Sequence, residues 1–209
     1  MEKPSTKKTL IDTLAVFIVK KISNFFWEIA DAWSYKNNKI AQRYNDSIED
    51  EYQKECDACG VSPNSKVLHI GCGAYPLTEL VLARCCSGTL VGIDKNQLAV
   101  QRAREVIRNH HLENRITVHH GNGIDYPVDD FDMILISSCS LPKVQILEHL
   151  FKNVKSKCVI IVREIRIATP DIFRCISEHP EITIVQQMHH TPFPFYGPLG
   201  WDTIYLQKN

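Results

Sequence analysis

The feature that most constrains this chain is a pair of apolar runs, the first ending in two glycines and the second in an aspartate. Residues 67–78 read VLHIGCGAYPLT and residues 90–94 read LVGID, so Asp94 lies 23 residues after Gly71. Glycine permits a sharp turn and brings bare backbone against a ligand. At this spacing an acidic side chain can accept hydrogen bonds from both hydroxyls of a ribose. The pair predicts a nucleoside-binding edge on a parallel sheet.

From residue 62 onward the chain alternates short β-branched runs with helical segments, which is typical of βαβ units. The expected strands are KVLHI, TLVGID, ITVHHG, FDMILISS, CVIIVREI, ITIVQQM and DTIYLQK. A Pro- and aromatic-rich segment, HHTPFPFYGPLGW at residues 189–201, joins the last two. We therefore predict an α/β fold with a Rossmann-like, seven-stranded, mostly parallel sheet and helices on both faces.

The first 60 residues differ in composition and pattern from the rest of the chain. They contain no glycine before Gly60 and no proline after Pro4, and their apolar residues recur at helical spacing. We predict an N-terminal helical cap over residues 1–60 and the Rossmann-like domain over residues 61–209. Its apolar stretch at residues 10–19 is too short and too polar to span a bilayer. We expect this helix to pack on the domain or cover its site, with contact to a membrane surface as the weaker alternative.

The charge balance and the cysteines limit the partners and the compartment. Lys plus Arg equals Asp plus Glu at 24 each, so there is no global field to attract nucleic acid, and none is expected as a partner. The eight cysteines lack the regular spacing of a disulfide scaffold, which indicates reduced thiols and a cytoplasmic location. The oligomeric state is left open by these features.

The candidate cofactor site follows from the strand order of open α/β sheets. Their ligands lie at the carboxyl ends of the strands near the topological switch point, here the first, second and fourth strands. After the third strand, Asn122 can both donate to and accept from an adenine edge, although it can equally be a simple turn residue. The predicted cofactor-binding residues are Gly71, Cys72, Gly73, Asp94, Lys95, Asn122, Gly123, Ser137 and Ser138.

Each main element of this site also has a structural interpretation. The glycine pair can be an ordinary strand-to-helix turn, and Asp94 can be the N-cap of the helix that starts near Asn96. A dinucleotide cofactor is disfavoured, because Pro76 occupies the position of the third glycine in that fingerprint.

Taken together, these residues make the segment 62–209 resemble the class I S-adenosylmethionine-dependent methyltransferases, whose parallel sheet ends in an antiparallel pair. The resemblance implies S-adenosylmethionine as the cofactor, with Asp94 at its ribose and Asn122 beside its adenine. Asp132, in FDMILIS, looks like the acid that commonly opens the fourth strand of this family and can be structural.

Within that superfamily, GCGAYPLTELVLA, LPKVQILEHLFKNV and CVIIVREI are similar to the core of nicotianamine synthases, whose loop reads glycine-x-glycine-x-x-proline-leucine-threonine. Those enzymes transfer the aminocarboxypropyl group of the same cofactor and release methylthioadenosine. Here the helical N-terminal part is short, and their substrate-clamping residues have no residue-by-residue match. The resemblance therefore implies the cofactor and leaves two transfers open.

The catalytic residues are less defined, because an activated sulfonium chiefly requires alignment of the acceptor and exclusion of water. A general base is needed only if the acceptor arrives protonated. The Asn/Asp-Pro-Pro-aromatic tetrapeptide of amino-group methyltransferases is absent after FDMILI, which disfavours exocyclic base amines as acceptors. The weak catalytic candidates are Tyr44, Tyr52, His190 and Tyr196; further residues expected near the open edge are Cys139, Arg163, Glu164, His189 and Trp201.

Each of these residues has a packing alternative. Aromatic side chains beside prolines often only fill a long hairpin loop, and Arg163 with Glu164 can be an exposed ion pair.

Cys56 and Cys59 form a solitary CxxC motif. Zinc needs two more ligands, and no spaced histidine pair accompanies these cysteines. A redox motif is expected at a thioredoxin-like βα junction rather than between a cap helix and the first strand. We predict buried thiols and no metal site.

The sequence thus predicts a methyltransferase that uses S-adenosylmethionine and acts on a small-molecule acceptor. The first alternative is an aminocarboxypropyl transferase similar to nicotianamine synthase. The second is a non-catalytic Rossmann-like module whose helical N-terminus binds a partner or a membrane.

Overall fold

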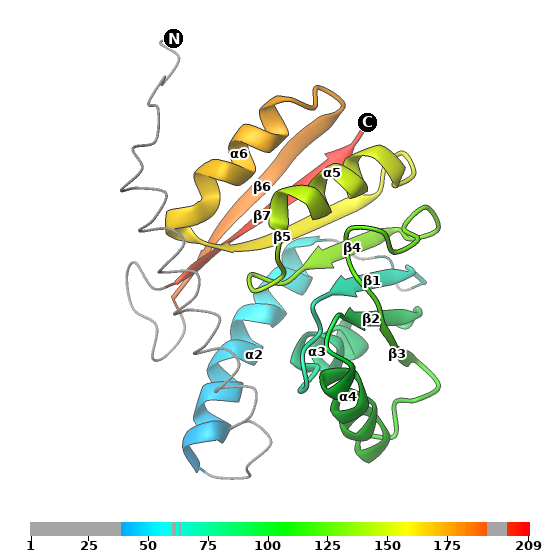
Figure 1. Ribbon diagram of the computed structural model, residues 1–209. Helices are drawn as coiled ribbons and strands as arrows, with labels where there is room; N and C mark the ends of the chain where they lie inside the picture. Colours follow the sequence, from blue (N-terminus) through cyan, green and yellow to red (C-terminus); the bar gives the residue numbers. More distant parts are fainter. Residues whose placement is uncertain (1–38, 60–61, 63, 192–199) are drawn as a thin grey trace.

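The computed structural model of the protein describes residues 39–59, 62, 64–191 and 200–209. The strands in this part of the chain are β1 (Val67–Ile70), β2 (Leu90–Asp94), β3 (Ile116–His120), β4 (Met133–Ile136), β5 (Val159–Ile165), β6 (Ile182–His190) and β7 (Trp201–Lys208). They form one sheet in the order β3-β2-β1-β4-β5-β7-β6 (Figure 1). Strands β1 to β5 are parallel, whereas β7 is antiparallel to β5 and β6. The predicted Rossmann-like, mostly parallel sheet is confirmed.

The central strands are short and apolar because both of their faces are covered. Every residue of β1 and β4 is buried, as expected of parallel strands between two helical layers. Strand β6 forms an edge of the sheet and exposes Ile184 and Val185. The strands β1 and β4, which end at the predicted site, are therefore buried along their whole length.

Helices cover both faces of the sheet, as predicted. Helices α5 (Lys143–Asn153) and α6 (Thr169–Ser177) cover one face, above the sheet in Figure 1. On the other face, α3 (Leu77–Cys85) and α4 (Gln97–Asn109) pack on the sheet. Each layer has its own apolar cluster, built around Leu147 and Phe151 on the first face and around Leu80 and Val100 on the second.

One helix of the predicted N-terminal cap is described, namely α2 (Lys39–Cys59). It packs against α3, and its Cys56 belongs to the apolar cluster of that face. The expected helix over residues 10–29 lies outside the described residues. Within the described parts of the chain, no helix is both long enough and apolar enough to cross a membrane.

The last hairpin differs from the expectation. His189 and His190 belong to β6 rather than to a loop, and Trp201 begins β7 directly opposite His190. The antiparallel backbone ladder continues to this point, which fixes both side chains at the end of the sheet.

Candidate functional site

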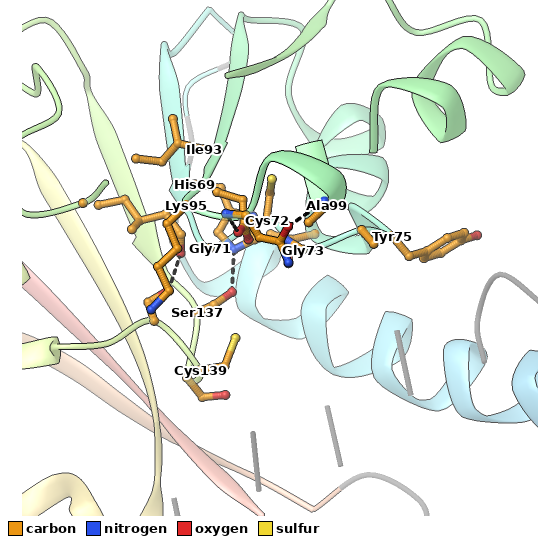
Figure 2. A pocket seen from close by; sticks show the side chains of 18 of the residues that line it. His69, Gly71, Cys72, Gly73, Tyr75, Ile93, Lys95, Ala99, Ser137 and Cys139 are labelled. Atoms are coloured by element: carbon orange, nitrogen blue, oxygen red, sulfur yellow. Dashed lines mark hydrogen bonds between the residues drawn. The ribbon is translucent and has the colours of Figure 1, made fainter. Parts of the chain in front are cut away.

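A cavity of about 510 Å³ lies at the carboxyl ends of β1, β2 and β4, within the range of roughly 300–1,000 Å³ that is usual for small-molecule sites. The glycine loop, Lys95 and Ser137 converge on it in Figure 2. All the residues predicted for the cofactor line this one cavity: Gly71, Cys72, Gly73, Asp94, Lys95, Asn122, Gly123, Ser137 and Ser138.

The loop after β1 has a backbone conformation that favours glycine. Gly71 and Gly73 have φ angles of +85° and +70°, in the left-handed region. A Cβ added at Gly71 would lie 2.1 Å from the hydroxyl oxygen of Ser140. The loop is anchored to β2, because the amides of Gly71 and Cys72 donate to the Ile93 carbonyl at 2.8 and 3.1 Å. Backbone therefore forms one wall of the cavity.

Asp94 holds this loop against the start of α4. Its Oδ2 accepts the amide of Gly73 at 3.0 Å, and its Oδ1 accepts the amide of Asn96 at 2.8 Å. The N-cap of α4 is Asn96, whose side chain accepts from Leu98 and Ala99. The N-cap interpretation of Asp94 was therefore wrong, and each of its carboxylate oxygens keeps a second acceptor position.

Asn122 is a turn residue, and its predicted place beside an adenine stays a prediction. Its carbonyl oxygen accepts the amides of Asp125 and Tyr126, which makes it a turn residue. Its side-chain oxygen accepts the Ile124 amide at 3.4 Å, a long contact that constrains the amide only weakly. The residue also lines the cavity beside Gly123.

A buried carboxylate, imidazole and hydroxyl are connected in series at the end of β1. The Nδ1 of His69 lies 2.8 Å from Oε1 of Glu79, and its Nε2 lies 2.7 Å from Oγ of Ser137. His69 and Glu79 are only 3% and 1% exposed, whereas His69 and Ser137 both line the cavity. Oε2 of Glu79 has no hydrogen-bond partner among the described residues.

This series was not predicted from the sequence. The available signal was a histidine inside the apolar run of β1 together with a glutamate on the buried face of α3.

Helix α2 supplies a second wall of the cavity, through Asn45, Ile48 and Tyr52. The ring of Tyr52 lies 3.6 Å from the guanidinium carbon of Arg163, in cation–π geometry. Burial raises the pKa of Tyr52, and the positive charge of Arg163 only partly opposes this effect. The side of the cavity opposite the glycine loop is therefore aromatic and closely packed.

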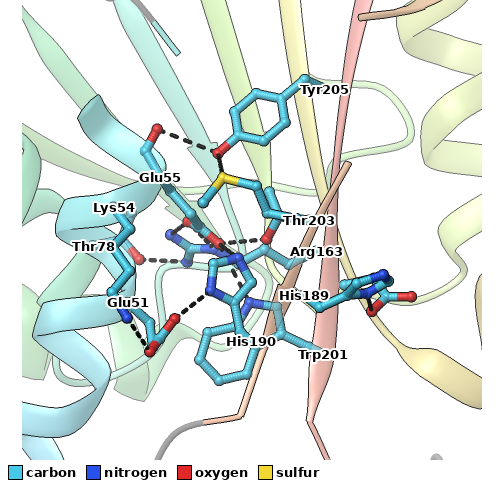
Figure 3. A network of polar contacts seen from close by, with 12 residues as sticks. Glu51, Lys54, Glu55, Thr78, Arg163, His189, His190, Trp201, Thr203 and Tyr205 are labelled. Carbon is cyan, nitrogen blue, oxygen red and sulfur yellow. Dashed lines mark hydrogen bonds and ion pairs between the residues drawn. The ribbon is translucent and has the colours of Figure 1, made fainter. Parts of the chain in front are cut away.

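Behind that wall lies a buried polar network centred on Glu55 and Arg163 (Figure 3). The Nε and Nη2 of Arg163 both donate to Oε2 of Glu55, at 2.8 and 2.6 Å, and Nη1 donates to the Thr78 hydroxyl at 2.8 Å. The Thr203 hydroxyl and the Trp201 indole donate to the other oxygen of Glu55. Burial disfavours the charge of Arg163, but the carboxylate of Glu55 outweighs it and raises the pKa.

His190 lies behind Trp201, stacked on the indole at 5.0 Å between ring centroids, and is fully buried. Its Nδ1 lies 2.7 Å from Oε2 of Glu51 on α2. Burial raises the pKa of Glu51, but hydrogen bonds from Lys54 and His190 bring it below its ordinary value. His190 is not among the residues that line the cavity.

Several other expectations have clear outcomes. The interpretation of Arg163 and Glu164 as an exposed pair was wrong, because both are buried on the central strand β5. Asp132 accepts the Lys66 amide at 2.7 Å and pairs with Lys155, which is a structural role. Tyr196 and the side chain of Tyr44 lie outside the described residues.

The cysteines show no covalent pairing within the described part of the chain. Cys56 is buried, whereas the side chain of Cys59 is outside the described set. Cys139 is exposed and lines the cavity.

The residues present fit a nucleoside cofactor with an amino-acid tail. The positive-φ glycines Gly71 and Gly73 line the cavity with backbone that carries no side chain. The carboxylate of Asp94, with its remaining acceptor positions, lies at the end of the adjacent strand, where ribose hydroxyls can be received.

Comparison with known proteins agrees with this geometry. A family model described as a methyltransferase domain matches residues 61–194. An L-histidine 2-aminobutanoyltransferase of Pseudomonas aeruginosa (strain UCBPP-PA14) is 36% identical over 74 residues, which are 35% of this chain and 28% of that protein. The enzyme of the same name from Yersinia pestis is 29% identical over 122 residues, 57% of this chain and 45% of that protein. The chain thus spans less than half the length of these curated relatives.

Solved structures share the fold at low sequence identity. A point mutant of the nicotianamine synthase MtNAS has a TM-score of 0.71 and 14% identity, covering 96% of this chain and 78% of that one. A methyltransferase from Geobacter sulfurreducens in complex with S-adenosyl-L-homocysteine has a TM-score of 0.61 and 14% identity, covering 77% and 91%.

Proposed function

The chain belongs to the methyltransferase-domain family, and from this premise we propose that it transfers the aminocarboxypropyl group of S-adenosylmethionine to a small-molecule acceptor. S-adenosylmethionine is the cofactor predicted from the sequence, and family membership confirms it. When bound, its sulfonium supplies an activated carbon, so the protein chiefly has to orient the acceptor and exclude water.

In this proposal the cofactor is held by the glycine loop and the strand ends that line the cavity. Gly71, Cys72 and Gly73 bring backbone against the ligand, and Asp94 receives the ribose hydroxyls. Asn122 and Gly123 lie beside the adenine. Lys95, Ser137 and Ser138 complete the same wall.

The observation that carries the choice of transferred group is the connection between the Pro-Leu-Thr end of the loop and helix α2. Thr78 accepts a hydrogen bond from Arg163, which is itself paired with Glu55 on α2. The loop ending that resembles nicotianamine synthases thus anchors the wall opposite the cofactor. The curated relatives, named for aminobutanoyl transfer, support the same choice.

The acceptor pocket lies between the glycine loop and the wall formed by Tyr52, Ile48 and Trp201. We infer that residues 1–60 act as a cap on a domain of residues 61–209. A pocket closed by a packed helix suits a small molecule better than a polymer, and the neutral overall charge argues against nucleic acid. We also propose a cytoplasmic location, on the irregular spacing of the eight cysteines in the sequence.

Ser137, His69 and Glu79 provide a route for the proton of an acceptor that arrives protonated. With Glu79 ionised, Nδ1 of His69 donates to it, and Nε2 accepts the Ser137 hydroxyl proton. A proton from the acceptor passes through Ser137 to His69, and Glu79 stabilises the resulting imidazolium. We infer that these residues, rather than His190, perform the acid–base step.

The experiment is to incubate the purified chain with S-adenosylmethionine and a fractionated metabolite extract and to identify the nucleoside product by mass spectrometry. Methylthioadenosine that forms only with an active fraction supports the proposal. S-adenosylhomocysteine identifies methyl transfer, the second candidate, which the family match favours. Neither product, in a protein that does not bind the cofactor, identifies a non-catalytic module.

A further inference from the structure

A cluster of potential metal ligands lies on the face of the sheet that α5 and α6 cover, opposite the face covered by α3 and α4. Glu148 belongs to α5, Cys175 to α6, and His179 follows the end of α6. One ligand atom from each of these residues lies within 4.8 Å of the other two. The groove beside the cluster shares no lining residue with the cofactor cavity. The cluster is therefore a separate feature of the molecule.

The distances are close to those of a four-coordinate metal site. Sγ of Cys175 lies 3.5 Å from Oε1 of Glu148, and Nε2 of His179 lies 3.0 Å from Oε2. Ligand bonds of roughly 2.0–2.3 Å in tetrahedral zinc sites place neighbouring ligand atoms roughly 3.3–3.8 Å apart. Small side-chain rotations convert the observed arrangement into that one. Cysteine sulfur, imidazole nitrogen and carboxylate oxygen are all zinc ligands.

The histidine is oriented by a second carboxylate. Oε1 of Glu181 lies 3.0 Å from Nδ1 of His179, on the side of the ring away from Glu148. Metal-binding histidines commonly donate their other ring N–H to a carboxylate in this way, which fixes the tautomer and increases ligand basicity. Glu181 therefore keeps Nε2 directed at the cluster.

The charges of the cluster also suit a cation. The thiol proton of Cys175 and a ring proton of His179 both converge on the carboxylate of Glu148. A divalent ion can replace both protons while leaving the carboxylate neutralised.

We propose that Glu148, Cys175 and His179 bind a divalent zinc-class ion, with Glu181 as the carboxylate that positions His179. Cys175 is buried, whereas Glu148 and His179 are partly exposed at the groove, so the ion enters from solvent and keeps water as its fourth ligand. The ion joins α5 to the segment between α6 and β6. The signal in the sequence was the four-residue spacing of Cys175 and His179, which was not predicted as a metal motif.

The test is a titration of the metal-stripped full chain with Co²⁺, followed by optical absorption. One equivalent is expected to bind and to produce a thiolate-to-cobalt charge-transfer band together with the visible bands of a four-coordinate ion. Zn²⁺ is expected to displace the cobalt and to raise the unfolding temperature of the protein, because it binds the folded state.

Three variants assign the signal to this cluster. Cys175→Ser is expected to abolish the charge-transfer band, and Glu181→Gln to weaken binding about 10- to 100-fold through the loss of the orienting carboxylate. Cys158→Ser is the matched control, because Cys158 is another buried cysteine and belongs to no such cluster among the described residues. It is expected to bind as the wild type does.

Circular dichroism verifies that each variant is folded. Absence of binding by the wild type, or equal binding by wild type and Cys175→Ser, overturns the proposal. A band that disappears in Cys158→Ser instead also overturns it. None of these outcomes depends on the transferase activity, so the metal site and the proposed function fail separately.

Discussion

The two walls of the cavity are built in opposite ways. The cofactor wall consists largely of backbone, shaped by two positive-φ glycines and held by Asp94. The acceptor wall is the side of the cavity formed by Ile48, Tyr52 and Trp201. It is held by a buried ion pair between Glu55 and Arg163, which are 108 residues apart in the chain. The cofactor wall is built from residues close to one another in the sequence, and the oxygens of Asp94 can still accept hydrogen bonds from a ligand. The acceptor wall depends on residues far apart in the sequence, and their charges are paired with each other within the protein.

Because of this difference, substitutions in the two walls should affect different properties of the protein, namely ligand affinity and folding stability. Changes in the cofactor wall should mainly reduce ligand affinity, because few other contacts depend on it. Changes in the acceptor wall should mainly reduce folding free energy, because they leave a buried charge without its partner. The following predictions use that separation, beginning with the largest effect.

Glu55→Ala is expected to lower the free energy of unfolding by about 3–5 kcal/mol, because it leaves the guanidinium of Arg163 buried without its carboxylate. Urea denaturation measures the change. Lys54→Ala is the control on the same helix, with an exposed side chain and an expected change within about 0.5 kcal/mol. Equal stabilities for the two variants would show that the buried pair does not hold the acceptor wall.

His69→Gln is expected to reduce turnover about 100-fold, a larger factor than its effect on S-adenosylmethionine affinity, because it removes the proton acceptor. Formation of the nucleoside product measures turnover. Glu79→Gln should move the pH profile of turnover, a change that a purely structural role does not produce. An unaltered profile with an unaltered rate would exclude the Ser137–His69–Glu79 route.

Gly71→Ala is expected to weaken cofactor binding at least tenfold, because a Cβ that meets Ser140 displaces the loop that lines the cavity. The left-handed conformation adds a loss of stability of about 1–2 kcal/mol. Gly88→Ala is the matched control, since its Cβ meets the Ser65 backbone away from the cavity. That control should lose stability and keep its affinity, as isothermal titration calorimetry can verify. Equal affinity losses in both variants would contradict the prediction.

Tyr52→Phe should produce the smallest effect. It removes only the phenolic hydroxyl, for which a change of about 0.5–1.5 kcal/mol is expected, and retains the ring beneath Arg163. Thermal unfolding and cofactor titration measure the two consequences. A large loss of cofactor affinity would mean that Tyr52, on the acceptor wall, also contacts the bound S-adenosylmethionine.

The contrast between the walls also explains what the sequence could predict. Gly71 and Asp94 were identifiable because the cofactor wall uses residues at fixed local spacing after strands. Glu55 was not, because its partner is on β5 and nothing local in α2 distinguishes a buried glutamate from an exposed one. Arg163 was expected near the open edge and does line the cavity, but its partner was not identifiable. The packing alternative paired it with the neighbouring Glu164, whereas its partner in the structure is Glu55 of α2.

His69 and Glu79 were missed for a related reason. Each lies in a largely apolar run, where a single polar residue gives no periodic signal. Only in the folded chain does Nδ1 of His69 lie 2.8 Å from Oε1 of Glu79. The fold itself was predictable, because the alternation of strand and helix extends over the whole domain.

The most direct measurement of the central claim is the affinity of S-adenosylmethionine for the wild type and for Asp94→Ala, by isothermal titration calorimetry. Asp129→Ala, at an exposed aspartate outside the cavity, is the control. The wild type and the control are expected to bind one equivalent, and Asp94→Ala to bind about 10- to 100-fold more weakly, as expected for lost hydrogen bonds to a charged group. Unchanged affinity in a folded Asp94→Ala variant, or no binding by the wild type, would contradict the account.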